Sequence, residues 1–163
     1  MNIDALIKAL ESIGGPVCLA ASQRLGAGAH DAPFDLHLRD AELDAVDARA
    51  LADGMQTLAR PGTALPGTAL PVTGGLRSFS ASYNSDLKDA GAIALAGAFP
   101  TTMTELGLVG CSIGDAGGRA LLEWAERASH LRMMCVEGNG FSSGVRSNFA
   151  RLGRRRTSLI VVV

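Results

Sequence analysis

Three cysteines are the side chains best suited to covalent chemistry in this chain: Cys18, Cys111 and Cys135. Their number is odd and no two of them form a CxxC pair, so the sequence predicts no disulfide framework and favours a reduced compartment. A cysteine nucleophile also needs a base and an orienting group that converge on its thiol. His130 is close to Cys135 in sequence only. We therefore predict an ordinary thiol at Cys135, a structural one at Cys111, and no enzymatic activity.

The histidines and glycines do not complete a cofactor site. His30, His37 and His130 share no metal-ligand spacing with one another or with the cysteines, so we predict no metal site. The glycine-rich sequences GAGA, at 26–29, and GNG, at 138–140, form no phosphate-binding pattern ahead of a helix. The sequence therefore indicates no bound cofactor.

A cluster of arginines near the C-terminus could bind anions. Its members are Arg146, Arg151, Arg154, Arg155 and Arg156. One interpretation is a patch for RNA or another polyanion. The other is the end of a helix, where cations meet the negative end of the helix dipole. No aromatic residues alternate with these arginines to stack on bases, and the formal net charge is −1. We favour the second interpretation and expect no nucleic-acid partner.

The same pattern of apolar residues occurs three times along the chain. A leucine follows eight residues after each of Leu43, Leu87 and Ile113, and short runs of alternating apolar residues precede them. The spacing is 26 residues from Leu87 to Ile113 and 28 from Ile113 to Phe141. Repeats of this length are typical of solenoids in which each unit is one strand and one helix. The sequence therefore predicts a short α/β solenoid.

This pattern divides the chain, which we expect to form a single domain, into five segments. They are an N-terminal cap (1–32), a degenerate first unit (33–60), a Pro/Gly loop insert (61–75), regular repeats (76–152) and a C-terminal edge strand (153–163). In the cap we predict a helix over 3–13, a short strand over 16–19 and a loop over 21–33. The insert contains PGTAL twice, and its prolines oppose regular structure, which predicts a mobile loop.

Further elements follow from the same periodicity. The predicted strands are 34–38, 77–81, 103–108, 131–136 and 159–163, and the predicted helices are 45–58, 89–98, 115–128 and 143–152. No apolar run approaches the roughly 20 residues that span a bilayer, so we expect no membrane segment and a cytoplasmic protein. Frequent alanine, glycine and arginine suggest a GC-rich coding sequence and a bacterial source. The last strand is uncharged and β-branched, and we expect its exposed edge to allow self-association.

The segment LGLVGCSIGDAGGRALLEWA shows most clearly what each position of a unit does. Leu106 and Leu108 face inward from a strand, because alternate strand residues share a face. Cys111 lies at the turn that follows, where its side chain can hydrogen-bond unpaired backbone groups. Ile113 returns to the core. Asp115 begins a helix, where its carboxylate can accept hydrogen bonds from the first backbone N–H groups.

With Asn84 and Asn139 at the same turn position, this pattern resembles the leucine-rich repeat family, and within it the ribonuclease-inhibitor-like subtype. The resemblance covers the regular repeats well and the first unit poorly. Ala41 replaces the turn residue there, Ala45 replaces the helix-start aspartate, and Ala81 is a small substitute for leucine in the next unit. The resemblance implies a short leucine-rich-repeat solenoid with parallel strands on the concave side, helices on the convex side and an N-terminal capping helix.

The resemblance also implies a non-enzymatic scaffold that binds a protein partner through its concave sheet face. The alternatives are a substrate-recognition module of a larger enzyme or bacterial effector, an anion or RNA site at the arginine cluster, and a sheet face that is merely solvated. The residues between and beside the inward apolar positions form the candidate partner-binding face: His37, Arg39, Arg77, Ser80, Ser82, Tyr83, Glu105, Val109, Arg132, Cys135 and Glu137. Tyrosine and arginine are common anchors of interfaces. We expect Trp124 to pack between helices instead.

Overall fold

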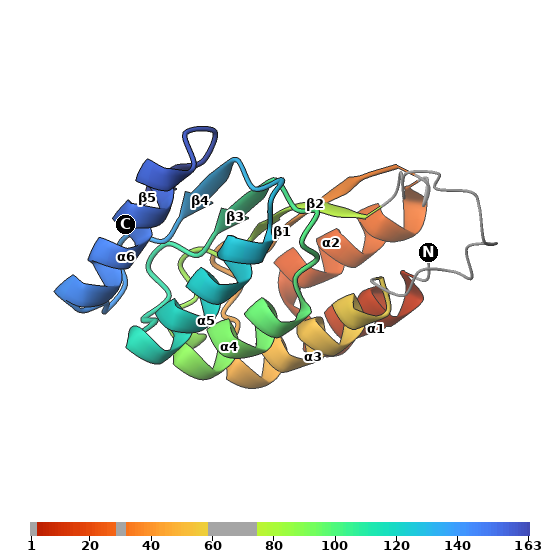
Figure 1. Cartoon of the computed structure of the whole chain (residues 1–163). Helices are drawn as coiled ribbons and strands as arrows, with labels where there is room; N and C mark the ends of the chain where they lie inside the picture. The colour runs from red at the N-terminus through yellow and green to blue at the C-terminus, as the bar shows by residue number, and fades with distance from the viewer. Residues whose placement is uncertain (1–2, 29–31, 59–74) are drawn as a thin grey trace, which may run out of the picture.

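The computed structural model describes residues 3–28, 32–58 and 75–163, which form one five-stranded parallel sheet and six helices (Figure 1). The strands are β1 (Phe34–His37), β2 (Leu76–Ser80), β3 (Glu105–Gly107), β4 (Met133–Cys135) and β5 (Ile160–Val162). They neighbour one another in chain order. Figure 1 shows the helices along one side of the sheet, while the other side is left open. This arrangement confirms the predicted α/β solenoid.

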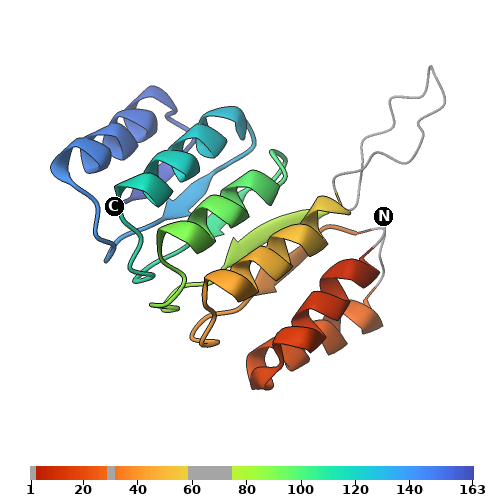
Figure 2. The same ribbon diagram turned by 90° about the horizontal axis from the view of Figure 1, so that it is seen from below.

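Four helices each follow a strand and lie side by side (Figure 2). They are α3 (Ala45–Gln56), α4 (Lys88–Ala98), α5 (Asp115–Arg127) and α6 (Ser143–Arg155). These bounds, and those of the strands, agree with the predicted elements to within a few residues. We call β1–α3 the first unit, β2–α4 the second, β3–α5 the third and β4–α6 the fourth. The predicted C-terminal edge strand is confirmed, since β5 pairs with β4 at the end of the sheet and Met133 lies opposite Ile160.

The predicted insert falls outside the described residues, apart from Gly75, as does His30. Among the helices of the described ranges, none combines the length and the apolar composition that crossing a membrane requires.

The N-terminal cap differs from the prediction. Its first helix, α1 (Asp4–Ile13), is confirmed and ends at Gly14, whose φ is +74°. The predicted strand over 16–19 and the predicted loop over 21–27 are wrong, because α2 (Gly15–Ala27) covers both. Pro16 suits the first turn of a helix, where no N–H is needed. Of the two helices, α1 lies beside α3 at the end of the row and α2 packs against α1 (Figure 2).

The predicted inward positions form a continuous core. Leu106, Leu108, Ile113 and Leu121 are all buried. Leu106 lies opposite Phe79 in β2 and opposite Met134 in β4, so one row of apolar side chains runs under the sheet.

Trp124 is also buried, as predicted for a residue that packs between helices. Its Nε1–H donates to the Phe99 carbonyl at 3.1 Å, and the centroids of the two rings are 5.2 Å apart. The third unit therefore packs through this residue against the connection that follows α4.

Asparagines at the turn position join successive units. Asn84 Oδ1 accepts the N–H groups of Ala41 at 3.0 Å and Leu43 at 2.9 Å, and its Nδ2 donates to the carbonyls of Leu38 and Ala81. The predicted role of the turn residue is confirmed, and its bonds also reach back to the preceding unit. Ala41 lies in the turn after β1, the first strand of the sheet, so among the described residues it has no earlier turn to bind. Its departure from the pattern therefore costs no such bond.

The third and fourth units use the same device. Asn139 Oδ1 accepts the N–H groups of Cys111 and Ile113, both at 3.0 Å, and its Nδ2 donates to the carbonyls of Leu108 and Val136. All four hydrogen bonds of its amide group are thereby made.

Two expectations about helix starts are corrected. The first unit does not lack a capping acid, because Asp44 accepts the N–H groups of Val46 and Asp47 at 2.7 and 2.9 Å in a complete capping box. Asp115 does not bind its own helix but accepts the Ser142 N–H of the fourth unit at 2.8 Å. Asp115 thus ties the third unit to the fourth.

Candidate binding face

The register of the strands places the outward side chains in rows across the open side of the sheet, which we call the exposed sheet face. The first row is Asp35, Ser78, Glu105, Met133 and Ile160, and the second is His37, Ser80, Gly107, Cys135 and Val162. Backbone hydrogen bonds beyond the strand ends continue this register into a third row of Arg39, Ser82, Val109 and Glu137. Eight of the eleven predicted residues lie in these rows, while Arg77, Tyr83 and Arg132 flank them.

The β1 end of this face is polar and internally bonded. Arg77 donates from Nε to Asp35 Oδ1 at 2.9 Å, and this hydrogen bond holds the pKa of the Asp35 carboxyl below its ordinary value. His37 Nε2 lies 3.4 Å from Ser78 Oγ, which donates to Glu105 Oε2 at 3.3 Å. The two carboxylates of the first row therefore already have donors within the chain.

Ser78 was missed in the sequence, although it lies in the first row beside Asp35 and Glu105. The register shifts between Phe34 and Asp35, so Arg77 faces no residue of β1 directly. Counting back two residues from Ser80 would have identified Ser78, because residues two apart in a strand face the same side of the sheet.

Arg39 and Tyr83 form a stacked pair at the third row. The Arg39 Cζ atom lies 4.4 Å from the centroid of the Tyr83 ring, within the range of a cation–π interaction. Tyr83 has a φ of +66° and is 48% exposed. The corresponding residues of the next two units are Gly110 and Gly138, with φ +62° and +72°. A bulky residue in this conformation is uncommon and costs free energy, of order 1 kcal/mol or more.

The absence of a side chain at Gly110 makes room for the Tyr83 ring. A Cβ atom at Gly110 would lie 3.3 Å from Tyr83 Cδ1, closer than ordinary contact. The Tyr83 N–H donates to the Val109 carbonyl at 2.7 Å, which fixes the backbone from which the ring projects. The geometry therefore holds an exposed aromatic ring and a guanidinium in a defined position.

The β4–β5 end of the face is apolar. Met133, Ile160 and Val162 are 41%, 59% and 40% exposed, and Cys135 lies half-buried between them. We call these four residues the apolar patch. Only Cys135 was predicted, because the continuous apolar run at the end of the chain does not show which residues face outward. The pairing of Met133 with Ile160 and of Cys135 with Val162 makes the patch contiguous.

The thiol of Cys135 is not poised to react as a thiolate. Burial raises its pKa above the ordinary value, and the nearby carboxylates of Glu137 and Glu105 raise it further. A raised pKa reduces the thiolate fraction, which is the nucleophilic form. His130 lies near Ser129, with Nδ1 3.4 Å from the hydroxyl oxygen, and has no hydrogen bond to Cys135. Within the described ranges no three His, Cys, Asp or Glu side chains are grouped as a metal site.

Four of the five arginines of the cluster, all but Arg154, donate hydrogen bonds within the described part of the protein. The Arg156 guanidinium donates to the carbonyls of Ala125, Ala128, Ser129 and Leu131 at 2.7–3.1 Å. It therefore caps the C-terminal end of α5 rather than that of α6, which precedes it in the chain. Arg155 donates to Glu126 at 2.9 Å.

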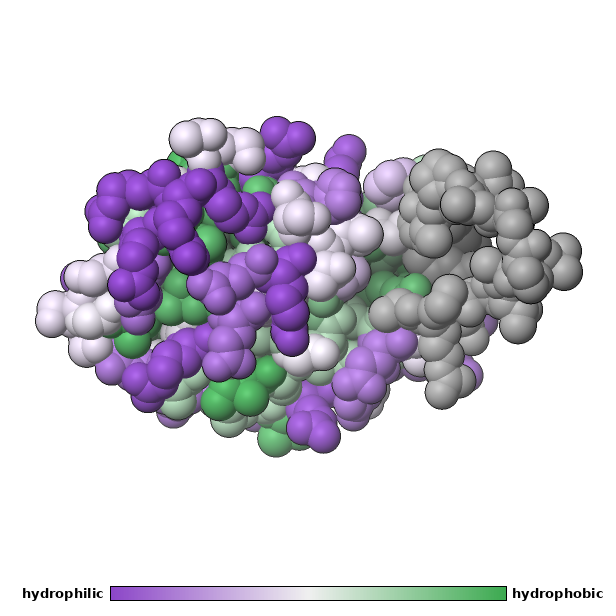
Figure 3. All heavy atoms as spheres, in the orientation of Figure 1, coloured by the Kyte–Doolittle hydropathy of each residue, from purple (hydrophilic) through white to green (hydrophobic). Residues whose placement is uncertain are grey.

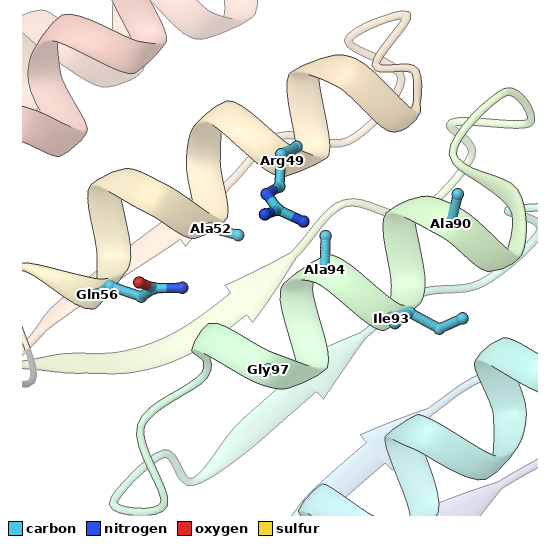
Figure 4. A pocket seen from close by; sticks show the side chains of 7 residues that line it. All are labelled: Arg49, Ala52, Gln56, Ala90, Ile93, Ala94 and Gly97. Atoms are coloured by element: carbon cyan, nitrogen blue, oxygen red, sulfur yellow. The ribbon is translucent and has the colours of Figure 1, made fainter.

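Hydrophobic side chains also reach the surface on the helical side. Figure 3 shows a hydrophobic area over α4, where Ile93 is 47% exposed. A cavity of about 220 Å³ lies between α3 and α4, lined by Arg49, Ala52, Gln56, Ala90, Ile93, Ala94 and Gly97 (Figure 4). Arg49 is the one titratable residue of this lining and pairs with Asp53 at 3.5 Å. The cavity therefore presents no catalytic group.

One comparison with known proteins bears on this architecture. A family model described as Leucine Rich repeat matches residues 99–122. This segment is similar to a leucine-rich repeat. It includes β3 and the first part of α5. No curated protein matches the chain. Together with the five parallel strands and their helices, the match establishes the fold as a short leucine-rich-repeat solenoid. Such repeats commonly mediate interactions between proteins and usually have no catalytic activity.

Proposed function

We propose that this leucine-rich-repeat chain is a non-enzymatic scaffold that binds a protein partner through its exposed sheet face. One observation carries the proposal: on this face, three large apolar side chains are 40–59% exposed in adjacent positions. Contiguous exposed apolar groups are typical of interaction sites. The stacked Arg39–Tyr83 pair lies on the same face and supplies the residue types that anchor many interfaces.

The finer assignments are also proposals. The helices of 11–13 residues in the four units support the ribonuclease-inhibitor-like subtype, in which the convex side is helical. The free cysteines support a reduced, cytoplasmic location.

The experiment compares two surface substitutions that introduce the same charge on opposite sides of the molecule. Met133→Glu alters the exposed sheet face, and Ile93→Glu alters the helical side at a residue of similar exposure. Each variant and the unaltered chain are used as bait in the native extract, and the captured proteins are quantified by mass spectrometry. We expect a specific partner that the Ile93→Glu variant still captures and the Met133→Glu variant does not. The reverse pattern would place the interface on the helices.

Self-association is a second proposal, favoured by the environment of β5. Among the described residues this strand pairs with β4 alone. Its Ile160 and Val162 side chains belong to the apolar patch. A strand with a free edge and exposed β-branched residues is a template for pairing with another chain.

A further inference from the structure

The exposed sheet face differs in charge and polarity from one end to the other, and this difference bears on its partner. The carboxylates of Asp35 and Glu105 have hydrogen-bond donors within the chain. Arg39 has no ion pair with any described carboxylate, and its guanidinium is held by the Tyr83 ring alone. It is therefore a preordered cation whose N–H groups are free for an acceptor.

The face has one further carboxylate, and it does not neutralise Arg39. Glu137 lies in the third row three strands away, about 14 Å at the usual spacing of strands. Its Oε2 is enclosed by protein and has no hydrogen-bond partner among the described residues. Asp40 and Glu42 are adjacent in the β1 turn but form no ion pair with Arg39.

Small side chains separate Arg39 from the apolar patch. Ser80 and Gly107 form the middle of the second row, and Ser82 and Val109 form the middle of the third. A partner backbone can approach closely above residues of this size. The distance from β1 to β4 or β5 is about 14–19 Å. A segment of about 12 residues spans it, because a helix of that length is about 18 Å long and an extended chain is longer.

From this arrangement we infer the chemistry of the partner, an inference that rests on the proposed function. The exposed sheet face recognises a polypeptide segment with apolar side chains at one end and an acidic side chain at the other. The apolar side chains cover Met133, Ile160 and Val162, and the carboxylate accepts from the Arg39 guanidinium on Tyr83. Charge complementarity at Arg39 favours an acidic group, because this guanidinium has no carboxylate partner among the described residues.

The test uses random dodecapeptides displayed on phage, selected on the immobilised chain and identified by sequencing. We expect the enriched peptides to combine Leu, Ile, Phe or Met with Asp or Glu. A synthetic consensus peptide is then titrated against Arg39→Glu and against Arg49→Glu, which changes the net charge equally on the helical side. Binding should weaken at least about fivefold for Arg39→Glu, remain unchanged for Arg49→Glu, and weaken with rising salt.

Tyr83→Gly provides a second variant, chosen to keep the conformation of the turn. Glycine adopts φ +66° without strain, so this substitution removes the ring that holds Arg39 and leaves the turn intact. It should weaken binding of the consensus peptide without lowering the melting temperature.

Several results would overturn the inference. They are enrichment of basic peptides, enrichment of no peptide, and equal binding by the two arginine variants. Self-association lost in Arg39→Glu would identify a second copy as the occupant and would also overturn it. If a native partner no longer binds Met133→Glu but still binds Arg39→Glu, the proposed function is supported, whereas the inferred acidic group of the partner is contradicted.

Discussion

Asn139 Oδ1 accepts the backbone N–H of Cys111 at 3.0 Å, so a side chain of the fourth unit completes the turn of the third. The same amide group holds three further backbone groups, and Asn139 is buried. Substitution removes all four bonds at once and leaves buried polar groups without partners, which is more costly than losing an exposed hydrogen bond.

Asn139→Ala should therefore lower the free energy of unfolding by about 3 kcal/mol in urea denaturation. Asn148→Ala is the control, because the side chain of Asn148 binds only Arg151 among the described residues, on the surface of α6, and the substitution should cost less than about 0.5 kcal/mol. A loss below about 1 kcal/mol for Asn139→Ala would show that the turns are not joined by this side chain.

Leu108→Ala tests the register of the repeat. Leu108 is fully buried, so truncation leaves a cavity and should cost about 2–5 kcal/mol, measured as a lower melting temperature by circular dichroism. Leu19→Ala, at a residue 42% exposed, should change stability by less than about 0.5 kcal/mol. Equal melting temperatures for Leu108→Ala and the unaltered chain would contradict the assignment of Leu108 to the core.

Deletion of residues 66–70 removes one copy of PGTAL from the sequence-predicted insert, which lies outside the described residues. We expect little change in stability, because the entropy of loop closure varies slowly with loop length. Urea denaturation of the deletion variant checks this prediction. A loss of several kcal/mol would mean that the insert packs as a structural element.

The reactivity of Cys135 should depend on pH and on Glu137. Burial and two carboxylates raise the pKa of this thiol, so its thiolate is scarce at neutral pH and increases as the pH rises toward that pKa. Glu137→Gln removes one negative charge, lowers the pKa and should accelerate modification by Ellman's reagent at pH 8. Glu123→Gln, on the exposed surface of α5, should leave the rate unchanged. Equal rates in all three proteins would exclude this electrostatic control.

Removal of residues 159–163 tests self-association through β5. The shortened chain should be less stable, because buried Leu159 and the pairing with β4 are lost. It should also associate less than the unaltered chain when the two are compared by light scattering. A strictly monomeric unaltered chain at millimolar concentration would contradict the proposal.

The parts of the fold that follow a local rule could be predicted from the sequence. Leucines at a constant spacing identify the units, since each must return to one core. The helix α2 was missed because most of its buried residues are small, Cys18, Ala21 and Ser22 among them, and its start is marked by Pro16. The apolar patch was only partly found because uniform apolar runs do not distinguish inward from outward residues.

Side-chain contacts between neighbouring units were the hardest feature to predict from the sequence. They depend on how far one unit is displaced in space from the next. Asp89 lies in the first turn of α4, yet its Oδ1 accepts the N–H groups of Gly114 and Gly117 at the start of α5, both at 2.8 Å. A Cβ atom at Gly117 would lie 2.8 Å from that oxygen. The sequence around Asp89 contains no sign of this neighbour.

The direction of these bonds has a consequence for synthesis on the ribosome. The turn of the first unit needs Asn84 from the second, the turn of the third needs Asn139 from the fourth, and the end of α5 needs Arg156, which follows α6. Each unit thus emerges from the exit tunnel before the groups that complete it. We therefore expect co-translational folding of this chain to lag about one unit behind elongation, with the newest unit lacking partners for part of its backbone.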